Sequence, residues 1–160
     1  MDYEPITKPA PSKMKSKPNI GDYAALRKSF KWQDAFNELD WLPGGGLNNA
    51  YEAVDRHVVH GFGDKLAMIW AGKNGEEERY TYSQFKEQSD RFGAVLQNMG
   101  LQRGDRVFIF LDRLPETYFT AMGTMKAGGV IGPLFSAFGP DPVRDRLQDS
   151  GAKFLVTSPE

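Results

Sequence analysis

The residues of this chain that could carry out chemistry follow its most apolar segments. Residues 111–113, 135–138 and 157–158 each come directly after an apolar run that predicts a buried strand. In open α/β sheets, ligands bind beyond the carboxyl ends of the strands. If the three strands are parallel and share one sheet, these segments are the predicted places for a ligand.

Arginines near two of these segments indicate that the ligand could be anionic. Arg113 follows the first predicted strand, and Arg144 and Arg146 lie in the helix predicted after the second. A guanidinium group binds phosphate through several directed hydrogen bonds. Arg146, however, is expected rather to form a surface ion pair with Asp145 or Asp149, which would contribute about 0–1 kcal/mol to stability.

Two further patterns predict structure rather than chemistry. Gly128-Gly129 follows a predicted helix and precedes a strand, whereas a phosphate-binding glycine loop needs the opposite order. We therefore interpret this pair as a helix C-cap and turn. His57 and His60 lie three residues apart in one predicted helix, but the sequence places no third ligand beside them. The sequence predicts no catalytic residue and no metal site.

The composition limits the class of protein. The chain has 160 residues, of which 40% are hydrophobic and 26% are charged, as in an ordinary globular domain. Its net charge of −1 gives no electrostatic reason to bind nucleic acid or an anionic membrane. It has no cysteine, which excludes disulfides and thiolate metal sites. No apolar run approaches the ~20 residues that span a bilayer, and no signal peptide is recognisable, so a cytoplasmic location is expected.

Alternating strand and helix patterns position the candidate segments. Strands are predicted at 106–111, 130–135 and 153–157, with helices at 115–127 and 141–149 between them. Short strand–helix–strand links require parallel strands and right-handed crossovers. The predicted fold class is α/β, an incomplete doubly wound and mainly parallel sheet.

A hairpin and a capped helix are predicted before this sheet. The strands at 66–71 and 79–82 flank an Asn74-Gly75 turn, and Thr81 with Gln84 has the spacing of a capping box. The helix after the box and the helix at 115–127 both show an apolar stripe, which predicts the core face. The predicted core positions are Phe85, Phe92, Val95, Leu96 and Met99 on the first helix, and Tyr118, Phe119, Met122 and Met125 on the second.

Three stretches resemble the adenylate-forming enzymes, the superfamily that activates carboxylates with ATP. Tyr80-Thr81-Tyr82-Ser83-Gln84-Phe85 is similar to the first conserved core of that superfamily, and residues 125–135 are similar to the second. Gly104-Asp105-Arg106-Val107 with Pro115-Glu116 fits the strand and helix between the two cores.

The N-terminal part narrows the resemblance to acetyl-CoA synthetases. Trp32, Trp41 and the string at 47–57 are similar to the N-terminal extension typical of those enzymes. The prolines and lysines and the low apolar content of the first residues predict an extended or disordered leader at 1–21. The resemblance implies a helical extension at 22–62 and the beginning of an AMP-binding large domain, truncated, at 63–160.

The resemblance also implies a two-step ligase. ATP and acetate give an acyl-adenylate and pyrophosphate, with Mg²⁺ neutralising phosphate charge, and the CoA thiolate then displaces AMP. The implied partners are acetate, ATP, CoA and the remainder of the same chain, with neither nucleic acid nor membrane; a homo-oligomer is compatible with the family.

Few site residues carry over from that family. In acetyl-CoA synthetases, the loop after the second core strand approaches the CoA nucleotide, and here that loop is Ser136-Ala137-Phe138. The ATP loop, the carboxylate pocket and the catalytic lysine of the family would lie beyond Glu160, so these 160 residues are expected to be inactive alone. Two alternatives stay open: a synthetase for propionate or a larger carboxylate, and a non-catalytic binding or assembly module that keeps half of the fold.

Overall fold

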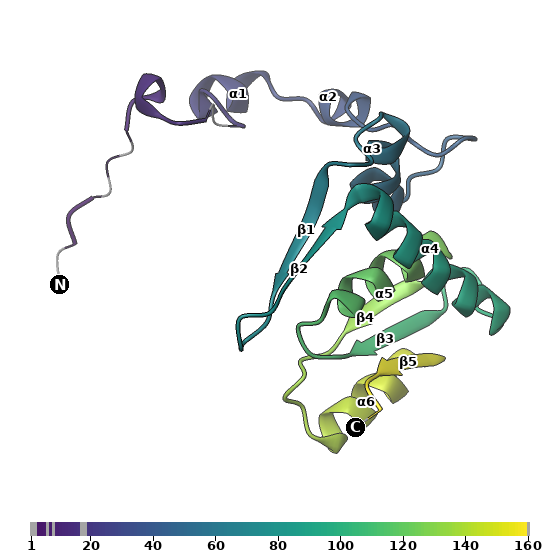
Figure 1. Ribbon diagram of the computed structural model, residues 1–160. Helices are drawn as coiled ribbons and strands as arrows, with labels where there is room; N and C mark the ends of the chain where they lie inside the picture. The colour runs from purple at the N-terminus through teal and green to yellow at the C-terminus, as the bar shows by residue number, and fades with distance from the viewer. Residues whose placement is uncertain (1–2, 6, 8, 17–18, 160) are drawn as a thin grey trace. The chain divides into compact units, whose positions relative to one another are not determined.

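The computed structural model describes residues 3–5, 7, 9–16 and 19–159, and the chain divides into two compact units, Met1–Leu39 and Asp40–Glu160 (Figure 1). The first unit contains a short 3₁₀ helix, η1 (Pro11–Lys13), and the helices α1 (Tyr23–Ser29) and α2 (Trp32–Asn37). The Asp22 carboxylate accepts a hydrogen bond of 3.0 Å from the Ala25 amide and so caps the start of α1. Part of the predicted leader at 1–21 lies outside the described residues.

The second unit begins with a loop and a helix of two kinds. The sequence predicts one helix that carries His57 and His60. The structure instead has a π-helical turn, η2 (Tyr51–Asp55), followed by a short α-helix, α3 (Arg56–Val59). The Asn48 side-chain oxygen accepts hydrogen bonds from the amides of Ala50 and Tyr51 and so caps the first turn. Gly61, at a φ of 81°, follows the helix.

An antiparallel hairpin leads into the longest helix. Strand β1 (Leu66–Ala71) pairs with β2 (Glu77–Thr81), and α4 (Tyr82–Asn98) follows directly. The predicted capping box is confirmed, because the Thr81 hydroxyl accepts from the Gln84 amide and the Gln84 side chain accepts from the Thr81 amide.

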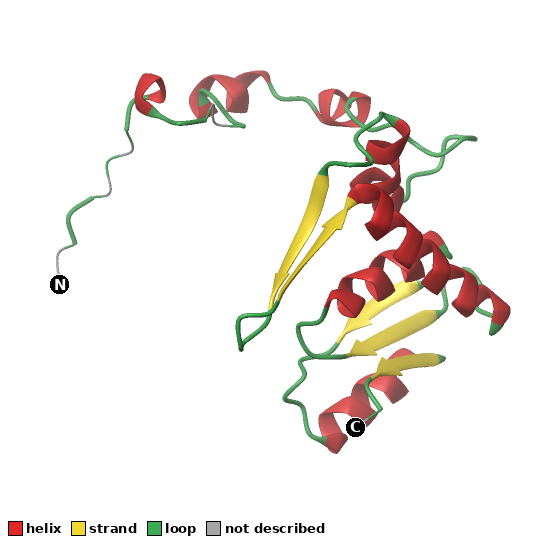
Figure 2. Cartoon of the chain, viewed as in Figure 1, coloured by secondary structure: helices red, strands yellow, loops and turns green. Residues whose placement is uncertain are grey.

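A three-stranded parallel sheet follows, as predicted. Strands β3 (Arg106–Phe110), β4 (Val130–Pro133) and β5 (Phe154–Thr157) lie in the order β4-β3-β5, joined by α5 (Pro115–Lys126) and α6 (Pro140–Ser150). Since β4 and β5 lie on opposite sides of β3, right-handed crossovers place α5 and α6 on opposite faces of the sheet (Figure 2). This arrangement is the doubly wound α/β class that the sequence predicts.

The core faces of α4 and α5 differ in part from the predicted stripes. Phe85, Leu96 and Phe119 are buried as predicted, but Val95, Met99 and Tyr118 are 49%, 65% and 49% exposed. The reason is a close approach of the two helices through their small residues: a Cβ on Gly93 would lie 3.0 Å from the Gly123 carbonyl oxygen. The line along which α4 and α5 touch runs through small residues rather than through the most apolar ones. The apolar side chains beside this line therefore point partly into solvent.

A second close approach lies within the sheet itself. Gly132 pairs with Phe108 across β4 and β3, and a Cβ at Gly132 would lie 2.8 Å from the Phe108 ring. The ring therefore occupies the space that any side chain at position 132 would need.

We predict that Gly132→Ala destabilises the chain by about 1–3 kcal/mol, because the added methyl group overpacks the Phe108 ring. The measurement is urea-induced unfolding of wild type and variant at equal protein concentration. Gly139→Ala is the matched control, since a Cβ there has no atom within 4 Å. An unchanged unfolding midpoint for Gly132→Ala would contradict the packing described here.

Candidate functional site

The candidate site lies beyond the carboxyl ends of β3 and β4. The loop after β3 leads to α5 on one face of the sheet, and the loop after β4 leads to α6 on the other. Neighbouring strands whose connections leave to opposite faces open a crevice, which is where doubly wound sheets bind ligands. The fold therefore brings together two of the three segments predicted from the sequence.

A pocket of about 690 Å³ occupies this crevice and is closed on one side by the β1–β2 hairpin. Asp112, Arg113 and Leu114 line it from the loop after β3, and Ser136 from the loop after β4. The hairpin contributes the remaining lining residues: Trp70, Ala71, Gly72, Lys73, Asn74 and Glu76.

One hydrogen bond ties the hairpin to the sheet edge. The Trp70 indole Nε1 donates to the Arg113 carbonyl oxygen at 2.6 Å. Sequence analysis did not assign this role to Trp70, because the two residues lie 43 positions apart and nothing in the local pattern of β1 relates it to the loop after β3. Only the fold shows that the hairpin forms a wall of the site.

The pocket carries charges of both signs. Lys73 and Arg113 form no ion pair within the described part of the chain, and Glu76 and Asp112 lie among the same lining residues. Hydrogen bonds from the Asn74 side chain and amide hold the pKa of Glu76 below its ordinary value, so this carboxylate stays ionised at neutral pH.

The loop predicted to bind the CoA nucleotide is a short turn between two aromatic rings. Ser136 and Ala137 form the exposed tip, and the Phe138 amide donates to the Phe135 carbonyl oxygen at 3.0 Å. The Phe135 and Phe138 rings meet edge to face, with centroids 5.7 Å apart. The edge-to-face contact fixes the two ends of the turn relative to each other.

The arginines behave differently from one another. Arg144 pairs with Asp141 at 2.7 Å and with Asp145 at 3.0 Å. The predicted ion pair of Arg146 with Asp145 or Asp149 is wrong. Instead, the Arg146 guanidinium carbon lies 4.4 Å from the centroid of the Phe138 ring, and Asp145 pairs with Arg144.

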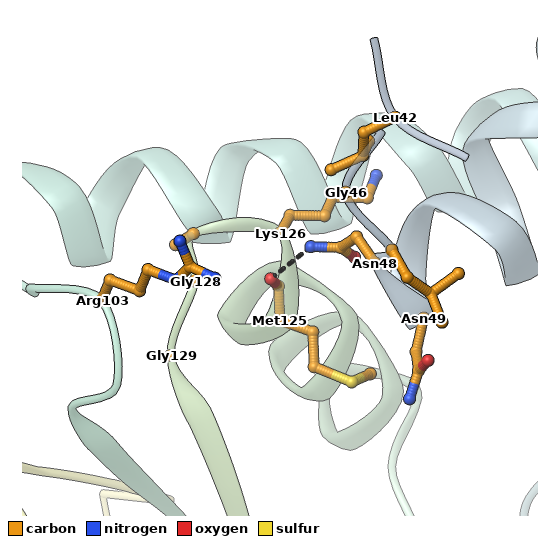
Figure 3. Close-up of a pocket in the computed structure, with 11 residues that line it drawn as sticks. Leu42, Gly46, Asn48, Asn49, Arg103, Met125, Lys126, Gly128 and Gly129 are labelled. Atoms are coloured by element: carbon orange, nitrogen blue, oxygen red, sulfur yellow. Dashed lines mark hydrogen bonds between the residues drawn. The ribbon is translucent and has the colours of Figure 1, made fainter. Parts of the chain in front are cut away.

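The opposite end of the sheet carries a second pocket, of about 560 Å³, around the C-terminus of α5 (Figure 3). Asn48 donates to the Met125 carbonyl oxygen at 2.8 Å and so ties the loop before η2 to the end of this helix. Gly128, at a φ of 84°, follows the C-cap of α5, which confirms that Gly128-Gly129 ends a helix. The glycine pair follows the helix α5 and precedes the strand β4. A phosphate-binding loop has the opposite order, with a strand before the glycines and a helix after them.

The segment Asp55-Arg56-His57 forms structural contacts. Arg56 pairs with Glu52 at 2.8 Å, and Asp55 pairs with Lys126 at 2.8 Å. Burial alone would raise the pKa of Glu52, but hydrogen bonds from the Trp41 and Asp40 amides, together with Arg56, lower it below its ordinary value. The His57 ring lies 4.6 Å from the Tyr82 ring, between centroids.

In the described ranges, no group of three or more histidine, aspartate or glutamate side chains could hold a metal ion. Over the same residues, no helix is long and apolar enough to cross a membrane.

The chain matches the family of AMP-binding enzymes across residues 55–160, and it belongs to that family. It is 43% identical over 143 residues to the acetyl-coenzyme A synthetase of Bacillus subtilis (strain 168), a match that covers 89% of this chain and 25% of that protein. It is 38% identical over 122 residues to the acetyl-coenzyme A synthetase of Rubrobacter xylanophilus, which covers 76% of this chain and 19% of that protein. The chain thus spans a quarter or less of the length of these curated relatives.

Solved structures confirm the predicted fold. The crystal structure of a Brucella canis acyl-CoA synthetase matches with a TM-score of 0.78 and 30% identity, over 84% of this chain and 24% of that chain. The N-terminal subdomain of Klebsiella oxytoca NpsA, in complex with 3-hydroxyanthranilyl-AMSN, matches with a TM-score of 0.60 and 31% identity, over 69% of this chain and 27% of that chain.

We predict that His57 makes the stability of the chain depend on pH below about 6.5. Burial, followed by the charges of Arg56 and Lys65, lowers the pKa of His57 from its ordinary value of 6.5. The unfolded chain therefore binds a proton at a higher pH than the folded chain, and the stability present above pH 6.5 falls as the pH is lowered.

The measurement is the free energy of unfolding of wild type and His57→Phe from pH 7.5 to 5. The variant keeps a ring against Tyr82 but cannot titrate, so we expect a flatter curve. The chain has two histidines, and both proteins keep the other one, His60, whose Nε2 lies 2.7 Å from the Asp40 carboxylate, so the comparison isolates His57. Equal slopes for wild type and His57→Phe would contradict the prediction.

Proposed function

We propose that this chain is the N-terminal part of an acyl-CoA synthetase that converts acetate, ATP and CoA to acetyl-CoA, AMP and pyrophosphate. The observation that carries the proposal is the 43% identity to an acetyl-coenzyme A synthetase over 89% of this chain. The fold of the Brucella canis acyl-CoA synthetase, matched at a TM-score of 0.78, supports the same class of reaction.

The proposed reaction has two balanced steps. An acetate oxygen attacks the α-phosphorus of ATP and forms a new P–O bond. Pyrophosphate leaves with the electron pair of the bond that joined it to the α-phosphorus. The CoA thiolate then attacks the carbonyl carbon of the acetyl-adenylate, and AMP leaves with its phosphate oxygen. Mg²⁺, which would accompany ATP, fits no site among the described residues, because these contain no suitable cluster of ligands.

Within this reaction, we assign Ser136, Ala137 and Phe138 to binding of the CoA nucleotide. The turn lies at the carboxyl edge of β4, its tip is exposed, and Ser136 lines the pocket that it shares with Arg113. An exposed turn without large side chains at its tip allows a nucleotide to approach the backbone closely. These properties support a binding role and leave the chemical groups of catalysis to other residues of the enzyme.

The carboxylate specificity is tested first. In the complete enzyme, acetate-dependent ATP–pyrophosphate exchange should exceed butyrate-dependent exchange in kcat/KM by about tenfold or more, because each extra methylene is discriminated by a closed pocket. Propionate is compared in the same assay. Higher kcat/KM with propionate would change the assigned substrate, and the absence of exchange with all three acids would reject the synthetase.

We predict that Ala137→Trp raises the KM for CoA about tenfold or more and leaves the KM for ATP and acetate near wild type. Ala137 is exposed, so the ring fits without a clash in the fold but occupies the space of the nucleotide. Acetate-dependent pyrophosphate exchange should stay nearly intact, since that half-reaction needs no CoA.

Ala137→Gly is the control, and we expect it to keep the wild-type KM for CoA because it adds no bulk. Equal loss in both half-reactions of Ala137→Trp would indicate damage to the fold. An unchanged KM for CoA would remove this turn from the site.

A further inference from the structure

We propose that Arg146 binds a phosphate group of CoA and that the Phe138 ring holds its guanidinium in place for this purpose. The inference rests on the proposed function, which places the CoA nucleotide at the turn of Ser136 and Ala137. It adds a residue outside the turn and names the chemical group that this residue recognises.

The first observation is the isolation of this positive charge. Two residues away on the same helix, Arg144 is neutralised by Asp141 and Asp145. Arg146 forms no ion pair within the described part of the chain: Asp145 is paired with Arg144, and no ion pair joins Arg146 to Asp149. A guanidinium without a carboxylate partner is free to bind an external anion.

The second observation is that this cation is held in a defined place. The Arg146 guanidinium carbon lies 4.4 Å from the Phe138 ring centroid, and its Nη1 donates to the Pro142 carbonyl oxygen at 2.9 Å. Arginine has five N–H donors, so one bond to Pro142 leaves a face of donors for a ligand. Stacking on the ring restricts the long side chain, which reduces the entropy lost on binding.

The third observation is the position of the ring. Phe138 packs against Phe135, and the two rings bracket the turn that carries Ser136 and Ala137. The guanidinium therefore lies directly beside the turn that we assign to the CoA nucleotide. The anionic groups of CoA are its diphosphate and its 3′-phosphate, and planar N–H donors suit phosphate oxygens.

The test compares Arg146→Ala with wild type in the complete enzyme. The KM for CoA should rise about tenfold, the loss expected for one charge-assisted hydrogen bond, while acetate-dependent pyrophosphate exchange stays unchanged. Arg146→Lys should recover part of the loss, because it restores the charge without the planar fork. Arg144→Ala is the matched control and should leave the KM for CoA within about twofold, since its charge is already neutralised.

Shorter acceptors identify the group that Arg146 binds. Pantetheine carries no phosphate, so its KM should be the same for wild type and Arg146→Ala. Dephospho-CoA lacks only the 3′-phosphate. If Arg146→Ala still raises the KM for dephospho-CoA, Arg146 binds the diphosphate. If the two enzymes have the same KM for dephospho-CoA, Arg146 binds the 3′-phosphate. An equal rise with pantetheine would overturn the proposal, because Arg146 would then act on the shape of the turn.

The role of the ring is tested in the same assay. Phe138→Leu should raise the KM for CoA, and adding Arg146→Ala to it should raise the KM by less than in the wild-type background, because the guanidinium is already released. If Arg146→Ala does not fold, Arg146→Gln removes the charge but keeps a polar side chain, and the same CoA and pantetheine comparison applies.

Failure of this inference differs from failure of the proposed function. A wild-type enzyme that does not use CoA would reject the function itself. A wild-type enzyme that uses CoA, loses affinity for it in Ala137→Trp and keeps its KM in Arg146→Ala would reject only the role of Arg146.

Discussion

The close contact between Gly93 and Gly123 is the constraint on which the rest of the second unit depends. A Cβ on Gly123 would lie 2.5 Å from the Ser89 carbonyl oxygen, so the backbones of α4 and α5 meet without intervening side chains. The hairpin is joined to the start of α4 through the Thr81 cap, and α5 connects β3 to β4. The distance between the two helices therefore sets where the hairpin lies relative to the carboxyl ends of β3 and β4. It thereby sets the shape of the pocket that lies between them.

Charged side chains reinforce this helix pair. Lys126 on α5 forms ion pairs with Asp90 on α4 at 2.7 Å and with Asp55 of η2 at 2.8 Å. Lys86 also forms an ion pair with Asp90. Burial alone would raise the pKa of Asp90, but hydrogen bonds from Lys126 and Lys86 lower it. Charges paired in partly buried positions add little net stability but penalise other arrangements of the helices. Arg146 is the contrasting case, since its charge is positioned by a ring and is left for a ligand.

The elements and the sheet could be predicted because their signals are local. The capping box of Thr81 and Gln84, the glycines after helices and the apolar runs of β3 and β4 each act within a few residues. The exposed Val95 and Tyr118 could not be predicted, because an apolar stripe gives the mean direction of a core but not the line of closest contact. That line is set by the small residues of both helices together.

The sequence by itself determined the α/β class, the order of strands and helices, and the placement of residues 111–113 and 135–138 at carboxyl ends of parallel strands. Only the tertiary structure decided that Trp70 bonds the loop after β3, and that Arg146 lies on Phe138 rather than beside Asp145 or Asp149. The physical reason is the range of each interaction. Backbone preferences and periodicity are properties of neighbouring residues, whereas the partner of an indole N–H or a guanidinium is chosen among all groups that folding brings within reach.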